Sequence, residues 1–330
     1  MVGDQTAAGA RVTVAVLTYR RPSQVAALVP LLLSQLDALE TAVPGARGRL
    51  VVVDNDPAGS GRAAVERVVG GADRRLRCVV EPAPGISAAR NRALDEAAPS
   101  DAVVFVDDDE TPAAGWLTAL VGAWRRYAAG AVAGPVVSVF AEEPDPWVRA
   151  GGFYDREHRA VTPTGRRLGS AATSNLLLDA ATVRRLGLRF DPAFGLTGGE
   201  DSRFTAALTA AGAPLVWCRE AVVTDHVPPE RATRAYVLHR TTALADATAR
   251  VRLLEHRGGL PRLLGRARVL ATAACRAGLG VALWGRGRWR EVVLRRAAVR
   301  DDARAHRHLA RARGELLAAV DRHVQPYART

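Results

Sequence analysis

Three consecutive aspartates, Asp107, Asp108 and Asp109, directly follow the apolar residues 103–106. The apolar run is typical of a central strand in a parallel sheet, and open α/β sheets bind their ligands outside the carboxyl ends of such strands. Carboxylates grouped there are the hard oxygen donors that Mg²⁺ and Mn²⁺ prefer. The triplet therefore predicts a divalent metal site. The alternative is a solvated acidic turn, with Asp109 or Glu110 near the start of the next helix.

Polar residues also follow other predicted strands. Strands are predicted at residues 12–17, 50–53, 76–80 and 102–106, and helices at 22–40, 63–69, 86–96 and 116–127. This alternation predicts the α/β class, with a mostly parallel sheet flanked by helices on both faces, so that the polar strand ends meet at one edge. No Gly-x-Gly-x-x-Gly and no Walker A sequence follows the first strand, which argues against a dinucleotide-binding site or a P-loop.

The pattern is less regular after residue 130. We expect an irregular segment over residues 140–170, of the kind that forms lids or binding loops. After Pro228 and Pro229 the chain is expected to be helical to its end. Between these points we predict strands at residues 131–140, 174–178, 215–218 and 221–224, and helices at 180–186 and 202–211.

Charge is unevenly distributed along the 330 residues, whose formal net charge is +12. Residues 231–330 hold 22 Arg against 7 Asp or Glu, a net of +15, whereas residues 1–230 hold 24 Arg against 27 Asp or Glu, a net of −3. We therefore predict a catalytic domain over residues 1–230 and a basic helical C-terminal extension over residues 231–330. A basic segment attracts anionic lipid, nucleic acid or a phosphorylated substrate.

Three features bear on the compartment. The polar N-terminus lacks the basic and apolar regions of a signal peptide. No stretch reaches 18 uninterrupted apolar residues, and the best candidate span, residues 269–284, contains Arg276. The three cysteines are far apart and indicate a reducing compartment. We expect a cytoplasmic protein.

Six short motifs follow one another along residues 11–230. In chain order they are Thr18-Tyr19-Arg20-Arg21-Pro22, Val52-Val53-Asp54-Asn55, Gly85-Ile86-Ser87-Ala88-Ala89-Arg90-Asn91, Asp107-Asp108-Asp109, Gly199-Glu200-Asp201 and His226. This order resembles family 2 glycosyltransferases with the GT-A fold. The resemblance implies a Rossmann-like GT-A domain that transfers a sugar from a nucleotide-diphosphate donor.

The resemblance assigns the acidic triplet to the metal site. It implies that Asp109 ligates Mn²⁺ or Mg²⁺, that Asp107 lies near the ribose and the metal, and that Asp108 belongs to the donor site without a defined role. The cation would stabilise negative charge on the leaving diphosphate. His226 is implied as a ligand of the metal or the diphosphate. Its alternative is an exposed residue at the end of a strand.

The nucleotide is implied to lie beside the first two strands. Asp54 would accept a hydrogen bond from an N–H of the nucleobase, and Thr18, Tyr19 and Arg20 would border the same site. The alternative for residues 54–57 is an Asx turn, and the two roles can coexist.

Arg90 and Asn91 resemble the donor-contacting pair of the family. The Arg90 guanidinium could bind phosphate or base oxygens, and its alternative is a surface residue of a helix. The expected donors are UDP-, GDP- and dTDP-sugars.

Asp201 is implied as the base that removes the proton of the acceptor hydroxyl, with Glu200 supporting the acceptor or the local structure. A base of this type implies in-line attack with inversion at the anomeric carbon. The alternative is a pair of acidic residues favoured by the dipole at a helix N-terminus. The chain departs from the family at Ala207, where many relatives have an arginine, and Arg203 is the candidate substitute.

The C-terminal extension carries arginines among Leu, Ala and Val, a composition that suits a membrane surface. Arg286, Arg288 and Arg290 flank Trp284 and Trp289, as at a membrane interface. This predicts peripheral contact with an anionic inner membrane face. The alternative is a helical cap that packs on the catalytic domain, and nucleic acid is the least favoured partner.

The resulting hypothesis is an inverting, metal-dependent glycosyltransferase that moves a sugar to an acceptor hydroxyl of a polysaccharide, a lipid-linked glycan or a natural product. A sugar nucleotidyltransferase is an alternative, but it would have a glycine-rich loop after the first strand. A non-catalytic membrane or nucleic-acid adaptor is the other, and the presence of Asp109 and Asp201 argues against it.

Overall fold

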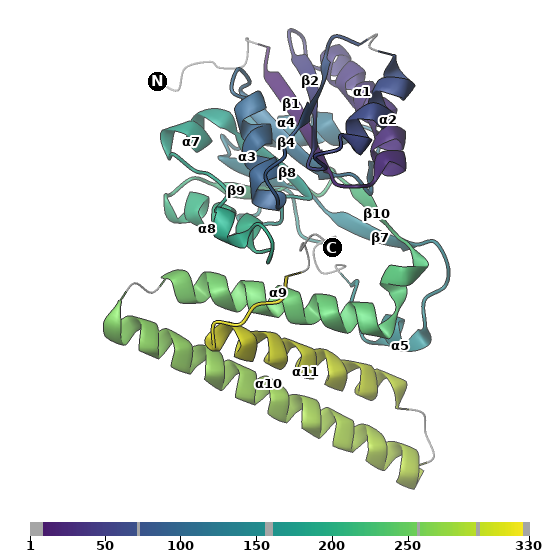
Figure 1. Ribbon diagram of the computed structural model, residues 1–330, viewed down its shortest axis with the longest axis vertical. Helices are drawn as coiled ribbons and strands as arrows, with labels where there is room; N and C mark the ends of the chain where they lie inside the picture. The colour runs from purple at the N-terminus through teal and green to yellow at the C-terminus, as the bar shows by residue number, and fades with distance from the viewer. Residues whose placement is uncertain (1–8, 71–72, 156–160, 256–257, 295–297, 326–330) are drawn as a thin grey trace. The chain divides into compact units, whose positions relative to one another are not determined.

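The computed structural model describes residues 9–70, 73–155, 161–255, 258–294 and 298–325 (Figure 1). The chain forms two compact units. The first comprises Met1–Val137, Arg156–Gly195 and Glu200–His226, and the second comprises Ser138–Asp155, Leu196–Gly199 and Val227–Thr330. Two internal segments thus belong to the same unit as the basic extension. The domain boundary expected at residue 230 stays a prediction.

A seven-stranded sheet with the order β3-β2-β1-β4-β8-β6-β9 forms the centre of the first unit. Its first four strands are parallel, as predicted, and β8 is antiparallel to both of its neighbours, while β9 is parallel to β6. The strands are β1 (Arg11–Thr18), β2 (Arg47–Asp54), β3 (Leu76–Val80), β4 (Ala102–Asp107), β6 (Ala131–Ala133), β8 (Asn175–Asp179) and β9 (Leu215–Trp217).

Both faces of this sheet are buried, which explains the uninterrupted apolar runs in its strands. Val14 and Val16 of β1 belong to one core, to which α1 (Pro22–Ala42), α2 (Ser60–Val69) and α4 (Trp116–Arg126) contribute. Ala15 belongs to a second core, to which α3 (Ile86–Glu96), α7 (Ala180–Arg185) and α8 (Glu200–Ala210) contribute. The prediction of helices on both faces is therefore confirmed (Figure 1).

The single strand predicted over residues 131–140 is wrong. Two strands, β6 and β7 (Val136–Phe140), occupy this segment and belong to different sheets. Pro135 interrupts them because it has no N–H to donate to a ladder. A Cβ on Gly134 would lie 2.1 Å from the carbonyl oxygen of Ala221, so only glycine fits at this crossing.

A small sheet with the order β5-β10-β7 follows the acidic triplet in the chain. The triplet leads into β5 (Glu110–Pro112), which pairs antiparallel with β10 (Val223–Val227), rather than directly into a helix. The segment expected to be irregular, residues 140–170, contains α5 (Pro146–Ala150). Two short 3₁₀ helices, η1 (Pro192–Phe194) and η2 (Pro229–Ala232), lie further along the chain, and η2 follows β10.

Three long helices form most of the second unit and confirm that the C-terminal part is helical. They are α9 (Arg234–Glu255), α10 (Gly259–Leu294) and α11 (Val299–Ala319), and α11 lies along the other two (Figure 1). A Cβ on Gly314 would lie 2.2 Å from the carbonyl oxygen of Thr242, so α9 and α11 pack backbone to backbone at this point. Trp147 of α5 joins the bundle by donating a hydrogen bond to Asp302 at 2.6 Å.

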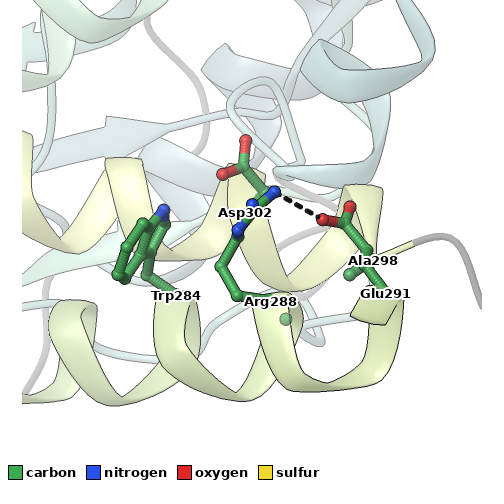
Figure 2. Close-up of a pocket in the computed structure, with 6 residues that line it drawn as sticks. Trp284, Arg288, Glu291, Ala298 and Asp302 are labelled. Atoms are coloured by element: carbon green, nitrogen blue, oxygen red, sulfur yellow. Dashed lines mark hydrogen bonds and ion pairs between the residues drawn. The ribbon is translucent and has the colours of Figure 1, made fainter. Parts of the chain in front are cut away.

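Charged residues join the C-terminal part of α10 to the start of α11. Asp301 accepts hydrogen bonds from Arg286 at 2.5 Å and from Arg290 at 3.0 Å. A cavity of about 340 Å³ next to these pairs is lined by Trp284, Gly287, Arg288, Glu291, Ala298 and Asp302. Figure 2 shows Arg288 pairing with Glu291, both of which line this cavity, at 3.2 Å.

Among the described residues, α1 and α10 are long and apolar enough to cross a membrane. α1 is accounted for as a core helix, because Leu28, Leu32 and Leu36 are buried in the first unit. In α10 only 17% of the most apolar window is buried.

Candidate active site

The carboxyl ends of β1, β2 and β4 bring the predicted site residues to one edge of the sheet. In the parallel ladders Thr18 is the partner of Asp54, and the preceding residue, Leu17, is the partner of Asp107. Residues from three distant segments thus lie next to one another. The ladder register confirms the prediction that these strand ends meet at one edge of the sheet.

The loop after β1 holds the acidic triplet in place. The Thr18 hydroxyl donates to Asp108 Oδ2 at 2.8 Å. Arg21 Nη1 bridges two carboxylates, donating to Asp108 Oδ1 at 2.9 Å and to Asp109 Oδ2 at 3.0 Å. Arg21 was quoted in the first motif but was not assigned to the site, because nothing in the sequence distinguishes it from Arg20.

Burial and mutual repulsion set the protonation of these carboxyls. Burial raises the pKa of Asp107 to about 7, and the charges of Asp109, Asp108 and Asp201 act in the same direction while Arg90 opposes them. The pKa of Asp108 is raised by burial and lowered by Arg21 and the Thr18 hydroxyl. Burial thus favours the protonated form of Asp107 and Asp108, while Arg90 and Arg21 oppose this effect.

Glu110 is a further buried acid that the sequence reasoning did not assign to the site. Its Oε2 accepts the backbone N–H of Asp107 at 3.2 Å. Burial raises its pKa well above the ordinary value, and the nearby Asp107 adds to the effect. Its position immediately after the triplet was the only available signal. Glu110 therefore holds the Asp107 backbone from a buried position next to the triplet.

Asp54 is fully buried and its carboxylate accepts three backbone N–H groups. The donors are Asp56 at 3.0 Å, Gly61 at 2.7 Å and Arg62 at 2.9 Å, the last two in the first turn of α2. The bond to Asp56 is an Asx turn, so that interpretation is confirmed. Asp54 therefore fixes the start of α2 beside the sheet edge, and its contact with a nucleobase stays a prediction.

Arg90 and Glu200 form a buried ion pair between α3 and the start of α8. Arg90 also lies over the Phe190 ring, 5.6 Å from the centroid. Glu200 Oε2 is buried without a hydrogen-bond partner among the described residues, and burial raises the Glu200 pKa despite the neighbouring arginine. The surface-helix alternative for Arg90 is therefore wrong, and its contact with the donor stays a prediction.

Asn91 of α3 forms hydrogen bonds with the loop that contains Phe190. Its Nδ2 donates to the Phe190 carbonyl at 2.8 Å, and its Oδ1 accepts the Phe190 N–H at 2.9 Å. Both polar ends of this side chain thus position the loop that precedes α8. Direct contact between Asn91 and a donor stays a prediction.

Asp201 lies in the first turn of α8, which begins two residues earlier than predicted. Its Oδ1 accepts the Ser202 N–H at 2.6 Å. The negative charge of Asp201 is one of those that raise the pKa of Asp107, so the two carboxylates are close enough to repel each other. Arg203, the candidate substitute for the missing arginine, pairs with Asp191 at 3.2 Å.

The remaining predicted residues lie at exposed or partly exposed positions. Arg20 is exposed, with a φ of +53°, and lies 5.2 Å from the centroid of the Tyr19 ring. His226 is exposed, and its Nε2 lies 2.9 Å from the Thr111 hydroxyl, within hydrogen-bond distance. A role for any of the three in binding stays a prediction.

The carboxylates at the end of β4 suit a divalent cation by their chemistry. Within the residues that the structure describes, no group of three or more His, Cys, Asp or Glu side chains is placed to hold a metal. Mg²⁺, however, commonly takes only one or two protein carboxylates and completes its shell with water and substrate phosphates. Asp107 and Asp109 provide such a pair, so the residues present fit the cation that the fold implies.

Comparison with known proteins identifies relatives of this chain. The model of glycosyl transferase family 2 matches residues 13–182. The succinoglycan biosynthesis protein ExoM of Rhizobium meliloti (strain 1021) is 35% identical over 230 residues, which are 69% of this chain and 71% of ExoM.

Solved structures show the same fold at low sequence identity. The mannosyltransferase PcManGT from Pyrobaculum calidifontis, in complex with GDP-Man and Mn²⁺, has a TM-score of 0.62 at 20% identity, over 96% of this chain and 89% of its own. Residues 1–349 of S. aureus TarS, in complex with UDP-GlcNAc, have a TM-score of 0.51 at 16% identity. The match covers 78% of this chain and 69% of the TarS chain.

The buried pair of Arg90 and Glu200 yields a stability prediction. Arg90→Met should lower the free energy of unfolding by about 3–5 kcal/mol, because it leaves a buried carboxylate without its partner. Glu200→Gln in the same chain should restore much of the loss. The loss should be larger at about pH 8 than at about pH 5, because burial raises the pKa of Glu200 in the folded chain. The stability contributed by a protonated Glu200 is present at low pH and is lost as the pH rises through the folded-state pKa.

Urea unfolding followed by circular dichroism measures these differences. Arg189→Met is the matched control, since Arg189 pairs with Asp95 at 2.5 Å on the surface and both side chains are about half exposed. That pair should contribute at most about 1 kcal/mol. Equal effects of the two arginine substitutions would contradict the role assigned to the buried pair.

Proposed function

The chain belongs to glycosyl transferase family 2 and has the GT-A fold, and from this premise we propose that it is an inverting, metal-dependent glycosyltransferase using a nucleotide-diphosphate sugar. The observation that carries the proposal is the position of the acidic triplet. Asp107 and Asp109 lie at the carboxyl edge of the sheet, where such folds bind ligands, and Asp107 shares its electrostatic environment with Asp201.

The proposed reaction replaces one bond to the anomeric carbon by another. The acceptor hydroxyl oxygen attacks this carbon, the bond to the β-phosphate oxygen breaks, and the nucleoside diphosphate leaves. Asp201 takes the proton of the hydroxyl. Attack opposite the leaving group inverts the anomeric configuration. Glu200, held by Arg90, orients the turn that carries Asp201.

Asp107 and Asp109 are the residues proposed to hold Mn²⁺ or Mg²⁺. The bound cation would act as a Lewis acid that stabilises charge on the leaving diphosphate. Before it binds, Arg21 and the Thr18 hydroxyl hold the neighbouring carboxylates in position. His226 is proposed as an additional ligand of the metal or the diphosphate.

Asp54, Thr18, Tyr19 and Arg20 are proposed to border the nucleotide. The ladder supports this for Thr18 and Asp54, which are neighbours at the carboxyl edge of β1 and β2. Arg90 and Asn91 would act mainly by positioning the loop around Phe190. The donor is proposed to be a UDP-, GDP- or dTDP-sugar.

The acceptor is proposed to be a growing glycan of polysaccharide biosynthesis. Support comes from the similarity to ExoM, which is a succinoglycan biosynthesis protein. A cytoplasmic location with peripheral contact at an anionic membrane surface is proposed as well. The net charge of +15 over residues 231–330 supports this contact.

Asp109→Ala tests the metal site. The substitution removes a ligand, so transfer should be abolished while the circular dichroism spectrum is unchanged. Asp37→Ala is the matched control, since Asp37 is exposed and pairs with Arg75. Release of nucleoside diphosphate from a panel of nucleotide sugars, with Mn²⁺ or with chelator, is the measurement. Full activity of the unaltered chain in excess chelator would refute metal dependence.

Asp201→Asn tests the base. The amide keeps the shape of the side chain but cannot accept the proton, so transfer should fall by at least about 10²-fold while binding of the donor, measured by calorimetry, is retained. Glu200→Gln is the comparison. Normal transfer by Asp201→Asn together with an inactive Glu200→Gln would show that the wrong carboxylate was assigned.

A further inference from the structure

One side of α10 is apolar and exposed along the whole helix. Its buried residues, Gly265, Val269, Ala273, Gly280 and Gly287, fall on the side that packs in the bundle. At 100° per residue, the opposite side contains six large apolar residues that are 50–70% exposed: Leu260, Leu263, Leu264, Val281, Trp289 and Val292. We call this side the outer face; its other positions are Ala, Gly, Cys or Val.

Arginines line the margins of the outer face. Arg268 and Arg286 lie along one margin and Arg288 along the other, all three exposed. The only acidic residue of α10, Glu291, is paired with Arg288 (Figure 2). Arg286 is paired in turn with Asp301 of α11. The face therefore combines an apolar strip with arginine margins whose charge is partly offset by Asp301 and Glu291, and no acidic residue lies on the strip itself.

We propose that α10 lies flat in the surface of an anionic bilayer, with its outer face in the acyl boundary and its marginal arginines at the lipid phosphates. This deepens the membrane contact proposed above by assigning it to one face of one helix. Helices of this composition bind in the plane of the interface, and arginines near an anionic surface add electrostatic attraction.

A crossing orientation suits α10 less well than a flat one. The 36 residues of α10 span about 54 Å, which exceeds the hydrocarbon thickness of about 30 Å. Crossing would also place the bundle side of the helix in lipid, including Arg276, which is paired with Glu315 at 3.3 Å. A second copy of the chain is a poorer occupant than lipid, because joining two outer faces would bring arginine margins together.

The test uses the full chain without donor or acceptor, so its result is independent of the transfer reaction. Co-sedimentation is measured with vesicles of phosphatidylcholine, with and without phosphatidylglycerol. Replacing Leu264, Val281 and Val292 by Gln should weaken binding to the acidic vesicles at least about tenfold, because apolar surface no longer leaves water. Replacing Val68, Val137 and Val161 by Gln is the matched control: each is an exposed valine outside α10, and binding should be unchanged.

The depth and orientation of α10 are tested by tryptophan quenching with brominated lipids. Quenching should be lost in Trp289→Phe, on the outer face, and retained in Trp284→Phe, which lines the cavity of Figure 2. Equal sedimentation of the intact chain with acidic and neutral vesicles, equal binding by the two triple variants, or a homodimer that only the α10 variant dissociates would each overturn the proposal.

A second inference concerns Arg21 and rests on the proposed function. One guanidinium nitrogen of Arg21 bridges Asp108 and Asp109, at 2.9 Å and 3.0 Å. The Arg21 side chain is 40% exposed, whereas those of Asp108 and Asp109 are 6% and 16% exposed. The guanidinium thus reaches the two buried carboxylates from the solvent side.

The geometry points to Arg21 as a positioning residue. Its guanidinium binds the Asp109 carboxylate until a divalent cation takes its place there. A guanidinium and a metal ion cannot share one carboxylate oxygen without repulsion. The displaced guanidinium would remain beside the site and could pair bidentately with the donor diphosphate. Arg21 would then keep the repelling carboxylates together in the absence of metal.

Mn²⁺ binding, followed by electron paramagnetic resonance of the free ion without donor, tests this role. Arg21→Gln should tighten Mn²⁺ binding severalfold, since the competing cation is gone, and Arg21→Lys, a point charge that matches the two carboxylates less well, should be intermediate. Arg20→Gln removes the same charge from the same loop and should change binding less. Unchanged or weaker binding by folded Arg21→Gln, or by Arg21→Lys if the former does not fold, would overturn the assignment.

Discussion

Crowding of carboxylates at the carboxyl end of β4 is the constraint on which the first unit depends. Asp107, Asp108 and Glu110 all have pKa values raised by burial, so keeping them charged costs free energy. Arg21 offsets part of this cost from the loop after β1, and Arg90 offsets part of it from α3. Segments that are distant in the chain are therefore tied electrostatically to one point.

Several polar side chains near this point act on backbone rather than on one another. Asp54 accepts hydrogen bonds from three backbone N–H groups at and just before the start of α2. Asn55 donates to the carbonyls of Glu81 and Ala83. Asn91 forms hydrogen bonds with both the backbone N–H and the carbonyl of Phe190. Loops around binding sites lack the hydrogen bonds of regular structure, so side chains must satisfy their buried backbone groups. These bonds fix the backbone of the loops that surround the sheet edge.

The second unit separates its charged and apolar contacts along one helix. Asp301 pairs with Arg286 and Arg290, and Glu315 pairs with Arg276, so part of the large positive charge is neutralised inside the bundle. Arg286 also lies at a margin of α10, where it borders, with Arg268 and Arg288, an apolar strip of a kind that soluble proteins rarely leave uncovered. A transferase that uses glycans assembled at a membrane would gain from such a strip, because it would confine the enzyme to the surface where its acceptor is made.

The amino-acid sequence by itself determined the α/β class, the order of the main elements and the family, because apolar periodicity and the six motifs are local in the chain. It also indicated that the ends of β1, β2 and β4 meet, because parallel strands share their polarity. It did not determine where the strand over residues 131–140 breaks, since that break depends on the approach of Ala221 to Gly134.

Only the tertiary structure decided which groups pair. Arg21 reaches the triplet from the loop after β1, and Arg90 pairs with Glu200, 110 residues away. Likewise, the sequence of α10 showed arginines among apolar residues, but packing against the bundle decided which side stays exposed. A partner for a charge is set by distance in space, and distance along the chain carries almost no information about it.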